Sequence, residues 1–344
     1  MWDGNFKDMN RQAITKLSSY NLPWPVDWIE IFGTEKPLIL DIGFGYGHTL
    51  EHLHKIHPEA NIIGVEIDNF CLTKAEKAIA RKDMYNVRVV RSKAETTLHH
   101  LFAVGSISEI HINFPDPWFK LRHSARRLMQ RDTLDAMVSR LVEGGLLYLA
   151  TDISAYAEMS AELLENTPGL NNTNDTPWID NMPGRVATKY EKKARRAGRD
   201  CYYFRYQRND TPAPDVPVIE EFEMPHMVIK SPLSLDEFAD KFTAQDNYAV
   251  GDTRIIFMST YRNDNSILFE VQVREPTIDQ RVALLFAKRK QADEYTLKPN
   301  MIGSPRSTDG LHNAVAVLGN ELVGLHEDSE ILKSTVKGQH VSNR

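Results

Sequence analysis

The segment PLILDIGFGYGHTL (residues 37–50) decides the fold. It begins with a short run of Leu and Ile that is typical of a buried strand, and it continues with glycines at alternate positions, Gly43, Gly45 and Gly47. Glycine allows a sharp turn and a close approach of the backbone to a ligand, beside the free amides of a helix N-terminus. The segment therefore predicts a strand, a ligand-binding turn and a helix.

Similar apolar runs recur downstream and alternate with segments of helical spacing. The predicted strands are 37–42, 61–67, 87–90, 107–114 and 146–151. One predicted helical face contains Leu72, Ala75, Ala78 and Ile79, and another contains Leu134, Met137, Val138 and Leu141. Strands that alternate with helices form a mainly parallel sheet covered on both faces. We therefore expect an α/β, Rossmann-like fold.

Changes in this rhythm mark the domain boundaries. A helix candidate and the turn LPWPVDW precede the alternating block, and NDTPAPDVPV, with three prolines in six residues, follows it as a stiff linker. The expected parts are an N-terminal extension (1–36), the α/β domain (37–209), the linker (210–217), a smaller α+β domain (218–332) and a flexible tail (333–344).

The smaller domain is expected to combine helices with a hairpin. Capping boxes, which open segments of helical type, are predicted for Ser234 with Glu237 and for Thr277 with Gln280. The segment 254–273 has the alternation of two paired strands, and 311–322 has one apolar helical face. We find no motif that carries chemistry in this domain.

Composition restricts the class of protein. The chain has 344 residues, enough for two cores, and a net charge of −6, which argues mildly against a general nucleic-acid binder. Cys71 and Cys201 cannot form a disulfide framework, so a reducing cytoplasm is expected. The first residues lack the apolar run of a signal peptide, and no run has the length of a membrane span.

Two carboxylates at strand ends indicate the ligand of the glycine turn. The spacing is G-x-G-x-G, which differs from the G-x-G-x-x-G of dinucleotide binders. Asp41, just before the turn, would repel a pyrophosphate but suits an ammonium group, and Glu66 ends the next strand, where a carboxylate accepts both ribose hydroxyls. An amino acid joined to a ribose without phosphate describes S-adenosylmethionine. The alternative is a tight turn that binds nothing.

A proline-flanked carboxylate follows the fourth predicted strand, in NFPDPWFKLRHSARRL (113–128). Pro115 ends the strand because it has no amide to donate. Asp116 then lies at the carboxyl end of a central strand, where open α/β sheets bind ligands. Pro115 and Pro117 restrict the backbone on both sides, so the carboxylate is expected to be held in place.

Two basic blocks with interspersed aromatic residues predict contact with nucleic acid. The first contains Lys120, Arg122, Arg126, Arg127 and Arg131, and the second contains Arg185, Lys189, Lys192, Lys193, Arg195, Arg196 and Arg199. The interspersed rings are Trp118, Tyr190, Tyr202 and Tyr203. Such a surface can follow phosphates and stack bases. The alternative is a solvated helix face.

Three segments carry a resemblance to a known family. NFPDPWFKLRHSARRL, ATDISAYAEMS (150–160) and VATKYEKKARRAG (186–198) are similar to characteristic segments of the bacterial tRNA (guanine-N7)-methyltransferase family, in the same order behind a similar cofactor turn. The resemblance covers residues 35–208. It implies a class I S-adenosylmethionine methyltransferase fold and methyl transfer to N7 of the variable-loop guanosine at tRNA position 46.

The resemblance also implies roles for individual residues. Cofactor binding falls to Asp41, Gly43, Gly45, Glu66, Lys93, Ala94 and Asp116. Asp116 is also the implied catalytic carboxylate. Contacts to the tRNA or its guanosine fall to Lys120, Asp152, Thr188, Lys189, Tyr190 and Glu191. Guanine N7 has a free lone pair, so the reaction needs positioning and a carboxylate that stabilises the cationic ring.

The chain departs from the family pattern in a few places. Lys93 stands where the family has an acid for the adenine amino group, so either a backbone group near Lys93 and Ala94 or the side chain of Glu95 serves the adenine. Ala125 replaces a usual cation, and AGRDCYYF replaces the family's usual ending. These departures motivate the main alternative, a non-catalytic tRNA-binding protein on a methyltransferase fold.

Other functions are weaker. A small purine-like substrate would leave the basic blocks idle, and the glycine spacing disfavours a nicotinamide cofactor. His52, His54 and His57 lack the spacing of a metal site, so no metal is expected. In the C-terminal domain the run 284–291 places Lys288, Arg289 and Lys290 on a predicted helix, which slightly favours an accessory RNA contact over self-association.

Overall fold

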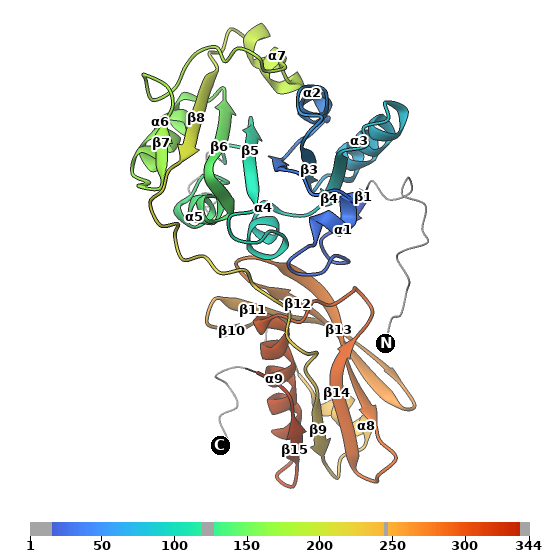
Figure 1. The fold of residues 1–344 in the computed structure, drawn as a ribbon. Coiled ribbons are helices and arrows are strands. Elements are labelled where there is room, and N and C mark those ends of the chain that lie inside the picture. Colours follow the sequence, from blue (N-terminus) through green and yellow to red (C-terminus); the bar gives the residue numbers. More distant parts are fainter. Residues whose placement is uncertain (1–15, 119–126, 244–246, 338–344) are drawn as a thin grey trace. The chain divides into compact units, whose positions relative to one another are not determined.

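The computed structural model describes residues 16–118, 127–243 and 247–337. The chain divides into two compact units, Met1–Ile219 and Glu220–Arg344 (Figure 1). Among the described residues, every helix is too short or too polar to cross a bilayer.

The first unit is built on an eight-stranded sheet with the order β1-β4-β3-β2-β5-β6-β8-β7. All neighbours are parallel except at β8, which is antiparallel to both β6 and β7. The strands are β1 (Lys16–Ser18), β2 (Leu38–Ile42), β3 (Asn61–Glu66), β4 (Val87–Arg91), β5 (Ile107–Asn113), β6 (Leu141–Thr151), β7 (Leu170–Asn172) and β8 (Tyr202–Arg208). The five strands predicted from apolar runs are confirmed.

Helices cover both faces of this sheet (Figure 1). They are α1 (Trp28–Phe32), α2 (His48–Ile56), α3 (Asn69–Arg81), α4 (Ala94–Thr96), α5 (Arg131–Arg140), α6 (Ser154–Glu165) and α7 (Lys189–Arg196), and Thr97–Leu101 forms a π-helical turn. Leu72, Ala75 and Ile79 of α3 are buried in one cluster with Val87 and Val89 of β4. Burying a side chain of the size of Leu or Ile contributes about 1.5–3 kcal/mol, so this apolar face fixes the helix on the sheet.

The strand order reverses beside β2, and this locates the ligand crevice. β2 lies between β3 and β5, so the connections from β2 to β3 and from β4 to β5 leave in opposite directions along the sheet. In open α/β sheets, ligands bind outside the carboxyl ends of the strands at such a point. The loops that follow Ile42, Glu66 and Asn113 meet there.

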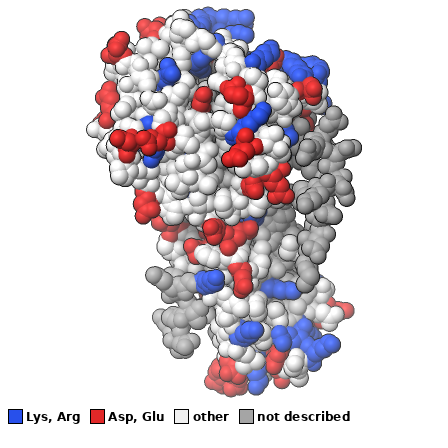
Figure 2. All heavy atoms as spheres, viewed as in Figure 1, with Lys and Arg blue, Asp and Glu red and all other residues white. Residues whose placement is uncertain are grey.

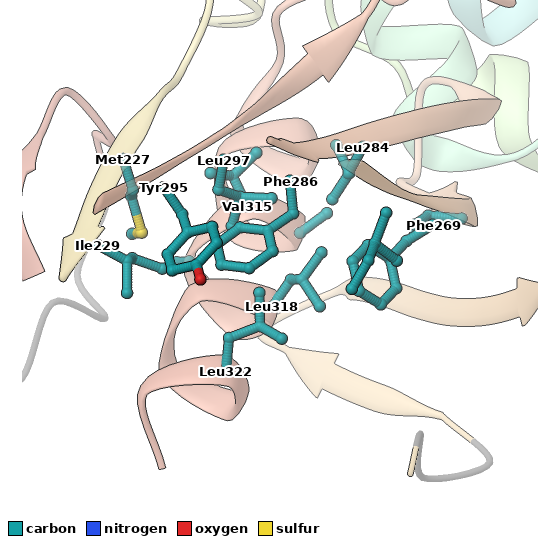
Figure 3. Close-up of a cluster of buried hydrophobic side chains, with 14 of the residues drawn as sticks. Met227, Ile229, Phe269, Leu284, Phe286, Tyr295, Leu297, Val315, Leu318 and Leu322 are labelled. Atoms are coloured by element: carbon teal, nitrogen blue, oxygen red, sulfur yellow. The ribbon is translucent and has the colours of Figure 1, made fainter. Parts of the chain in front are cut away.

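The second unit is a seven-stranded antiparallel sheet with the order β10-β11-β12-β13-β14-β9-β15. Its elements are β9 (Met227–Lys230), α8 (Leu235–Lys241), β10 (Tyr248–Val250), β11 (Thr253–Asn263), β12 (Ser266–Arg274), β13 (Asp279–Lys288), β14 (Glu294–Asn300), α9 (Asp309–Val323) and β15 (Glu330–Ser334). Leu311, Val315, Leu318 and Leu322 of α9 pack on the sheet in one cluster (Figure 3). The predicted hairpin, the capping box at Ser234 and the last helix are confirmed.

The helix predicted after Thr277 is wrong, because residues 279–288 form the central strand β13. Val282, Leu284 and Phe286 all face the core, which is the period of two of a strand. Gln280 is buried and donates to the carbonyl oxygen of Arg306 and to Thr308 Oγ1, so it does not cap a helix. Lys288 therefore ends a strand and does not lie on a helix.

The proline-rich segment is held on the first unit by Arg140. This fully buried guanidinium donates to the carbonyl oxygens of Leu98 (2.7 Å), Val216 (2.8 Å) and Pro217 (3.1 Å). The Ile219 amide adds a bond to the carbonyl oxygen of His99 at 2.9 Å. The end of the expected linker is thus tied down on the α/β fold.

The flexible tail expected from residue 333 is likewise corrected for its first part. β15 continues to Ser334, because its residues pair with β9 as far as Met227. The Thr335 amide donates to the carbonyl oxygen of His226 at 3.0 Å, and the Lys337 amide donates to His312 Nδ1 at 2.8 Å. Residues 333–337 therefore belong to the folded second unit.

Candidate active site

The glycine turn after β2 needs glycine for its backbone conformation. Gly43, Gly45 and Gly47 have φ values of 72°, 55° and 77°, in the left-handed region that other residues rarely adopt. A Cβ atom at Gly43 would meet nothing within 4 Å, whereas one at Gly45 would lie 3.6 Å from Cε2 of Tyr190. The turn therefore brings its bare backbone toward α7 and leaves space beside β2.

Glu66 braces this turn from the end of β3. Its Oε2 accepts from the Gly45 amide at 3.0 Å, and its Oε1 accepts from the amides of Ile67 (2.8 Å) and Asp68 (3.2 Å). Three amides fix the orientation of the carboxylate. An ionised carboxylate has about four acceptor positions, so one remains for a hydroxyl group of a ligand.

Asp41 is fully buried on β2 directly before the turn. Its Oδ1 accepts from Asn113 Nδ2 at 3.4 Å, while its Oδ2 is buried without a hydrogen-bond partner among the described residues. Burial raises the pKa of Asp41 to about 7, against the lowering effects of Asn113 and Arg185. A buried carboxylate oxygen without a donor is suited to receive the ammonium group of a ligand.

This buried acid makes a prediction about stability. In the unfolded chain Asp41 releases its proton at its ordinary pKa of 3.8, whereas in the folded state it keeps the proton up to about pH 7. Its contribution to stability is therefore lost as the pH rises from about 4 to about 7. Asp41→Asn removes this loss. We expect the variant to gain up to about 4 kcal/mol on the wild type between pH 4 and pH 8.

The measurement is urea unfolding without ligand at pH 5 and pH 8, with tryptophan fluorescence as the signal of unfolding. All five tryptophans lie in the first unit, so the signal reports that unit alone. The same pH dependence in Asp41→Asn and in the wild type would contradict a raised pKa at this position.

Asn113, at the end of β5, connects Asp41 with the loop before α7. Its Nδ2 also lies 3.4 Å from Thr49 Oγ1, and its Oδ1 accepts from an NH2 group of Arg185. The guanidinium of Arg185 lies 4.9 Å from the centre of the Tyr203 ring. Arg185 is thus bound to Asn113 and does not face solvent as part of a basic surface. In the sequence, Asn113 could have been noticed as the polar residue immediately before the Phe-Pro-Asp-Pro motif.

The loop that carries Asp116 is anchored on both sides. Phe114, at a φ of 53°, donates its amide to the carbonyl oxygen of Ala150 at 2.7 Å and packs against a buried cluster that includes Tyr203. Farther on, Arg127 donates to the carbonyl oxygens of Pro117 (3.1 Å) and Trp118 (3.3 Å). Asp116 itself is exposed. Lys120, Arg122, Ala125 and Arg126 lie outside the described residues.

The start of α7 faces the glycine turn. Thr188 is buried and caps the helix, with its Oγ1 accepting from the Glu191 amide at 3.1 Å. Glu191 is also buried and pairs with Arg195 at 3.1 Å. Lys189 and Tyr190 are exposed, and the Lys189 Nζ lies 4.0 Å from the centre of the Tyr46 ring.

The remaining predicted residues lie at the ends of β6 and β4. Asp152 follows β6, and its Oδ2 accepts from Arg199 Nε at 2.7 Å. Lys93 follows β4, and its carbonyl oxygen accepts from the amide (3.0 Å) and hydroxyl (2.8 Å) of Thr97. Ala94 and Glu95, both half-buried, open the short helix α4.

One cavity joins the glycine turn, β5 and α7. It is lined by Gly43, Phe44, Gly45, Tyr46, His48, Thr49, Asn113, Thr188, Lys189 and Tyr190. Four predicted residues besides Tyr190 therefore share its wall, namely Gly43, Gly45, Thr188 and Lys189. The sequence did not single out Tyr46, Thr49 or Asn113.

A larger cavity, of about 210 Å³, shares Thr49 and also includes His111 and Tyr148 in its lining. The His111 ring is stacked on Tyr148 with centres 4.5 Å apart, and its Nε2 lies 2.9 Å from Glu109 Oε2. Burial lowers the pKa of His111. We take the smaller cavity as the candidate site, because the glycine turn and the start of α7 line it. Asp41 and Glu66 lie near the carboxyl ends of β2 and β3, beside the turn, and are not part of this lining.

Some cations of the two basic blocks are paired within the protein. Figure 2 shows Lys and Arg gathered over α7 and the adjoining ends of α2 and α3. Several predicted RNA contacts are engaged within the protein, namely Arg127, Arg131, Arg185, Arg195 and Arg199. Tyr203 is only 2% exposed, so it cannot stack a base as predicted.

The three histidines after the glycine turn have structural roles. His52 Nε2 lies 2.7 Å from the carbonyl oxygen of Gly184, His54 Nδ1 lies 2.6 Å from Asn86 Oδ1, and His57 ends α2. Among the described residues, no three His, Cys, Asp or Glu side chains are grouped to hold a metal ion. Cys71 and Cys201 are free thiols.

Comparison with known proteins adds independent information. Residues 35–204 match the family described as "Putative methyltransferase". A tRNA (guanine-N(7)-)-methyltransferase of Cupriavidus metallidurans is 36% identical over 58% of this chain and 76% of its own length. The protein of the same name from Thermus thermophilus is 29% identical over 87% of this chain and 93% of its own length, so that match extends into the second unit. A solved structure titled "Structure of an antibiotic related Methyltransferase" is 22% identical, with a TM-score of 0.40 over 53% of this chain and 92% of that chain.

Proposed function

The chain belongs to the tRNA (guanine-N7)-methyltransferase family, and from this premise we propose a role for each polar group around the glycine turn. The protein is an enzyme that transfers a methyl group from S-adenosylmethionine to N7 of a guanosine in tRNA. The observation that supports the proposed site best is the buried Asp41 oxygen without a partner beside the braced carboxylate of Glu66.

These two carboxylates suit the two polar ends of S-adenosylmethionine. Asp41 would receive the ammonium group of the methionine part, since its Oδ2 lacks a donor. Glu66 would accept from a ribose hydroxyl at the acceptor position that the three amides leave open. The Lys93 carbonyl already accepts from Thr97, so we assign the adenine to the Ala94 amide and to Glu95 as the acceptor for its amino group.

S-adenosylmethionine supplies an electrophilic methyl carbon, which guanine N7 takes up as the carbon–sulfur bond breaks and S-adenosylhomocysteine is left. The N7 lone pair is free, so the chain has no strong base to provide and its task is to position the ring. The ring becomes cationic, and the Asp116 carboxylate stabilises that charge as it develops. Asp116 is therefore proposed as the catalytic residue.

The guanosine would lie between Asp116 and the start of α7. Asp152 can accept from the N1–H and amino edge of guanine in addition to its bond with Arg199, because a carboxylate has several acceptor positions. Glu191 and Thr188 fix the first turn of α7, and Tyr190 and Lys189 then project toward the cavity. The family resemblance adds two points to the proposal. Lys120 contacts the tRNA, and the methylated base is the variable-loop guanosine at position 46.

The test is transfer of labelled methyl from S-adenosylmethionine to unmodified tRNA, followed by aniline cleavage at 7-methylguanosine. We expect label at one variable-loop guanosine. Wild-type protein that binds both the cofactor and tRNA but transfers no label would instead be a non-catalytic RNA binder. Label at another base would contradict the proposed target.

Glu66 offers a selective prediction. Glu66→Gln removes the charge and turns one of the two acceptor oxygens into an NH2 donor, which must then face either the Gly45 amide or the Ile67 and Asp68 amides. The KM for S-adenosylmethionine is therefore expected to rise about 10- to 100-fold. The KM for tRNA should change little. Glu51→Gln is the control, because Glu51 is a partly exposed carboxylate on α2 that pairs with Lys55 and Lys82. Equal cofactor KM values in both variants would remove Glu66 from the cofactor site.

A further inference from the structure

A cluster of aromatic and basic side chains surrounds Tyr46 on the outer side of the glycine turn. The Tyr46 ring lies 6.2 Å from the Phe70 ring, in edge-to-face geometry. The Nζ atoms of Lys74 and Lys189 each lie 4.0 Å from the centre of the Tyr46 ring. The cluster therefore joins three elements, namely the turn, the first turns of α3 and the start of α7.

The cluster leaves large apolar surfaces in water. Phe70 is 65% exposed, Ile67 is 63% exposed and Tyr190 is 51% exposed. A single exposed apolar side chain needs no explanation, but several around one site indicate a binding surface. α3 does not need Phe70 for its packing, because it is anchored through Leu72, Ala75 and Ile79.

The charge of the cluster is positive. Lys74 and Lys189 both lie over the Tyr46 ring. Burial lowers the pKa of His48 on the same side of the turn, and Lys192, Lys74 and Lys189 lower it further while Glu51 raises it. Each neighbouring acid already has a partner. Glu66 accepts from the turn, Asp68 accepts from the Cys71 amide that it caps, and Glu51 pairs with Lys55 and Lys82. A polyanion is therefore favoured over a neutral or cationic partner.

Aromatic faces combined with lysines match the chemistry of unpaired nucleotides. A base stacks on an exposed ring, and the phosphates beside it are neutralised by ammonium groups. Tyr190 connects the cluster with the proposed guanosine site, because it lines the cavity. Burial raises the pKa of Tyr190, and the charge of Asp116 is among the further causes that raise it. A nucleotide on the cluster would be a chain neighbour of the guanosine that is methylated.

We propose that Tyr46, Phe70 and Lys74 form a stacking platform for an unpaired nucleotide adjacent to the target guanosine. The proposal rests on the proposed function, because it assumes a tRNA substrate. Phe70 provides the open face for the base, Tyr46 supports Phe70 from the turn, and Lys74 and Lys189 contact the phosphates. The platform contributes to tRNA affinity and not to the chemical step.

The test compares Phe70→Ala with Tyr85→Ala in the methyl-transfer assay. Tyr85 is a matched control, because it lies just beyond the other end of α3, is 58% exposed and also has a lysine, Lys36, over its ring at 5.8 Å. Phe70→Ala is expected to raise the KM for tRNA about tenfold, with an unchanged kcat and an unchanged KM for S-adenosylmethionine. Phe70→Tyr should restore the wild-type KM, and Tyr85→Ala should retain it.

A second variant separates the phosphate contact from stacking. Lys74→Gln should weaken tRNA binding and reduce the slope of log affinity against log salt by about one, since one phosphate contact is lost. A rise in the KM for S-adenosylmethionine in Phe70→Ala would mean that the ring covers the cofactor, and this outcome would overturn the platform. An unchanged KM for tRNA in both Phe70→Ala and Lys74→Gln, with methyl transfer intact, would also overturn the platform. A wild type without any methyl transfer would overturn the proposed function first.

Discussion

Asp116→Asn is expected to lower the kcat for methyl transfer by about 100-fold or more, with modest changes in both KM values. The amide keeps the shape of the side chain and an acceptor oxygen, but it removes the negative charge that stabilises the cationic guanine ring. Loss of one such group typically costs a factor of about 10² to 10³. The assay is a single-turnover measurement with saturating cofactor and with enzyme in excess over unmodified tRNA, which isolates the chemical step.

The substitution should leave the loop intact. Asp116 is exposed, while Phe114 and Arg127 hold the loop through their own contacts. The control is Asp135→Asn, which removes a partly exposed carboxylate from α5 that pairs with Arg131. We expect this control to retain wild-type kcat. If Asp116→Asn also retained it, the proposed catalytic role would be wrong.

Arg140→Met is expected to destabilise the first unit by about 3–5 kcal/mol. The side chain is fully buried and donates to three carbonyl oxygens, of Leu98, Val216 and Pro217. The buried Leu98 oxygen would lose this donor, while Val216 would keep the Ser139 hydroxyl at 3.3 Å and Pro217 is exposed. Loss of a hydrogen bond from a charged donor costs about 1.5–3 kcal/mol, and the cost is largest for the buried Leu98 acceptor. Burial lowers the pKa of Arg140 only to about 10, so the guanidinium is charged at neutral pH in the wild type.

Two measurements check this expectation. Urea unfolding followed by tryptophan fluorescence reports the first unit, and limited proteolysis reports release of the proline-rich segment near Val216. Arg131→Met is the matched control, because Arg131 also makes several hydrogen bonds from α5 but its side chain is 42% exposed. An equal loss of stability in the two variants would show that burial of Arg140 has no special effect.

The sequence predicted the α/β class and the five strands β2 to β6 of the first unit, because short apolar runs alternate with helical segments when a sheet is covered on both faces. The same logic placed Asp41 and Glu66, since polar residues at the ends of such strands must face a crevice or solvent. The sequence did not predict the strand order or the short edge strands β1 and β7. β8 was not predicted as a strand, although CYYFRYQ alternates, because its exposed Arg205 and Gln207 resemble the basic segment that precedes it.

The sequence alone did not predict which side chains point into the protein and which point into solvent. A basic block does not reveal which cations turn inward, and Arg185 does so only because Asn113 and the Tyr203 ring receive it. The segment 279–288 begins with an apparent capping box, but pairing with β12 and β14 overrides this local signal. The partner that decides the direction of Arg185 is 72 positions away in the sequence, whereas β13 is decided by pairing with the strands directly before and after it.

Glu66 has two functions, since it is the proposed ribose contact and it also holds the backbone of the glycine turn. The carboxylate that is proposed to receive the ribose also holds the Gly45 amide, so the same atom group serves as ligand contact and as part of the scaffold. An engineer who replaced Glu66 with a cation, to admit a phosphorylated ribose, would at the same time release the loop that surrounds the ligand. A change of cofactor in this protein would therefore require a redesigned turn and not a single substitution.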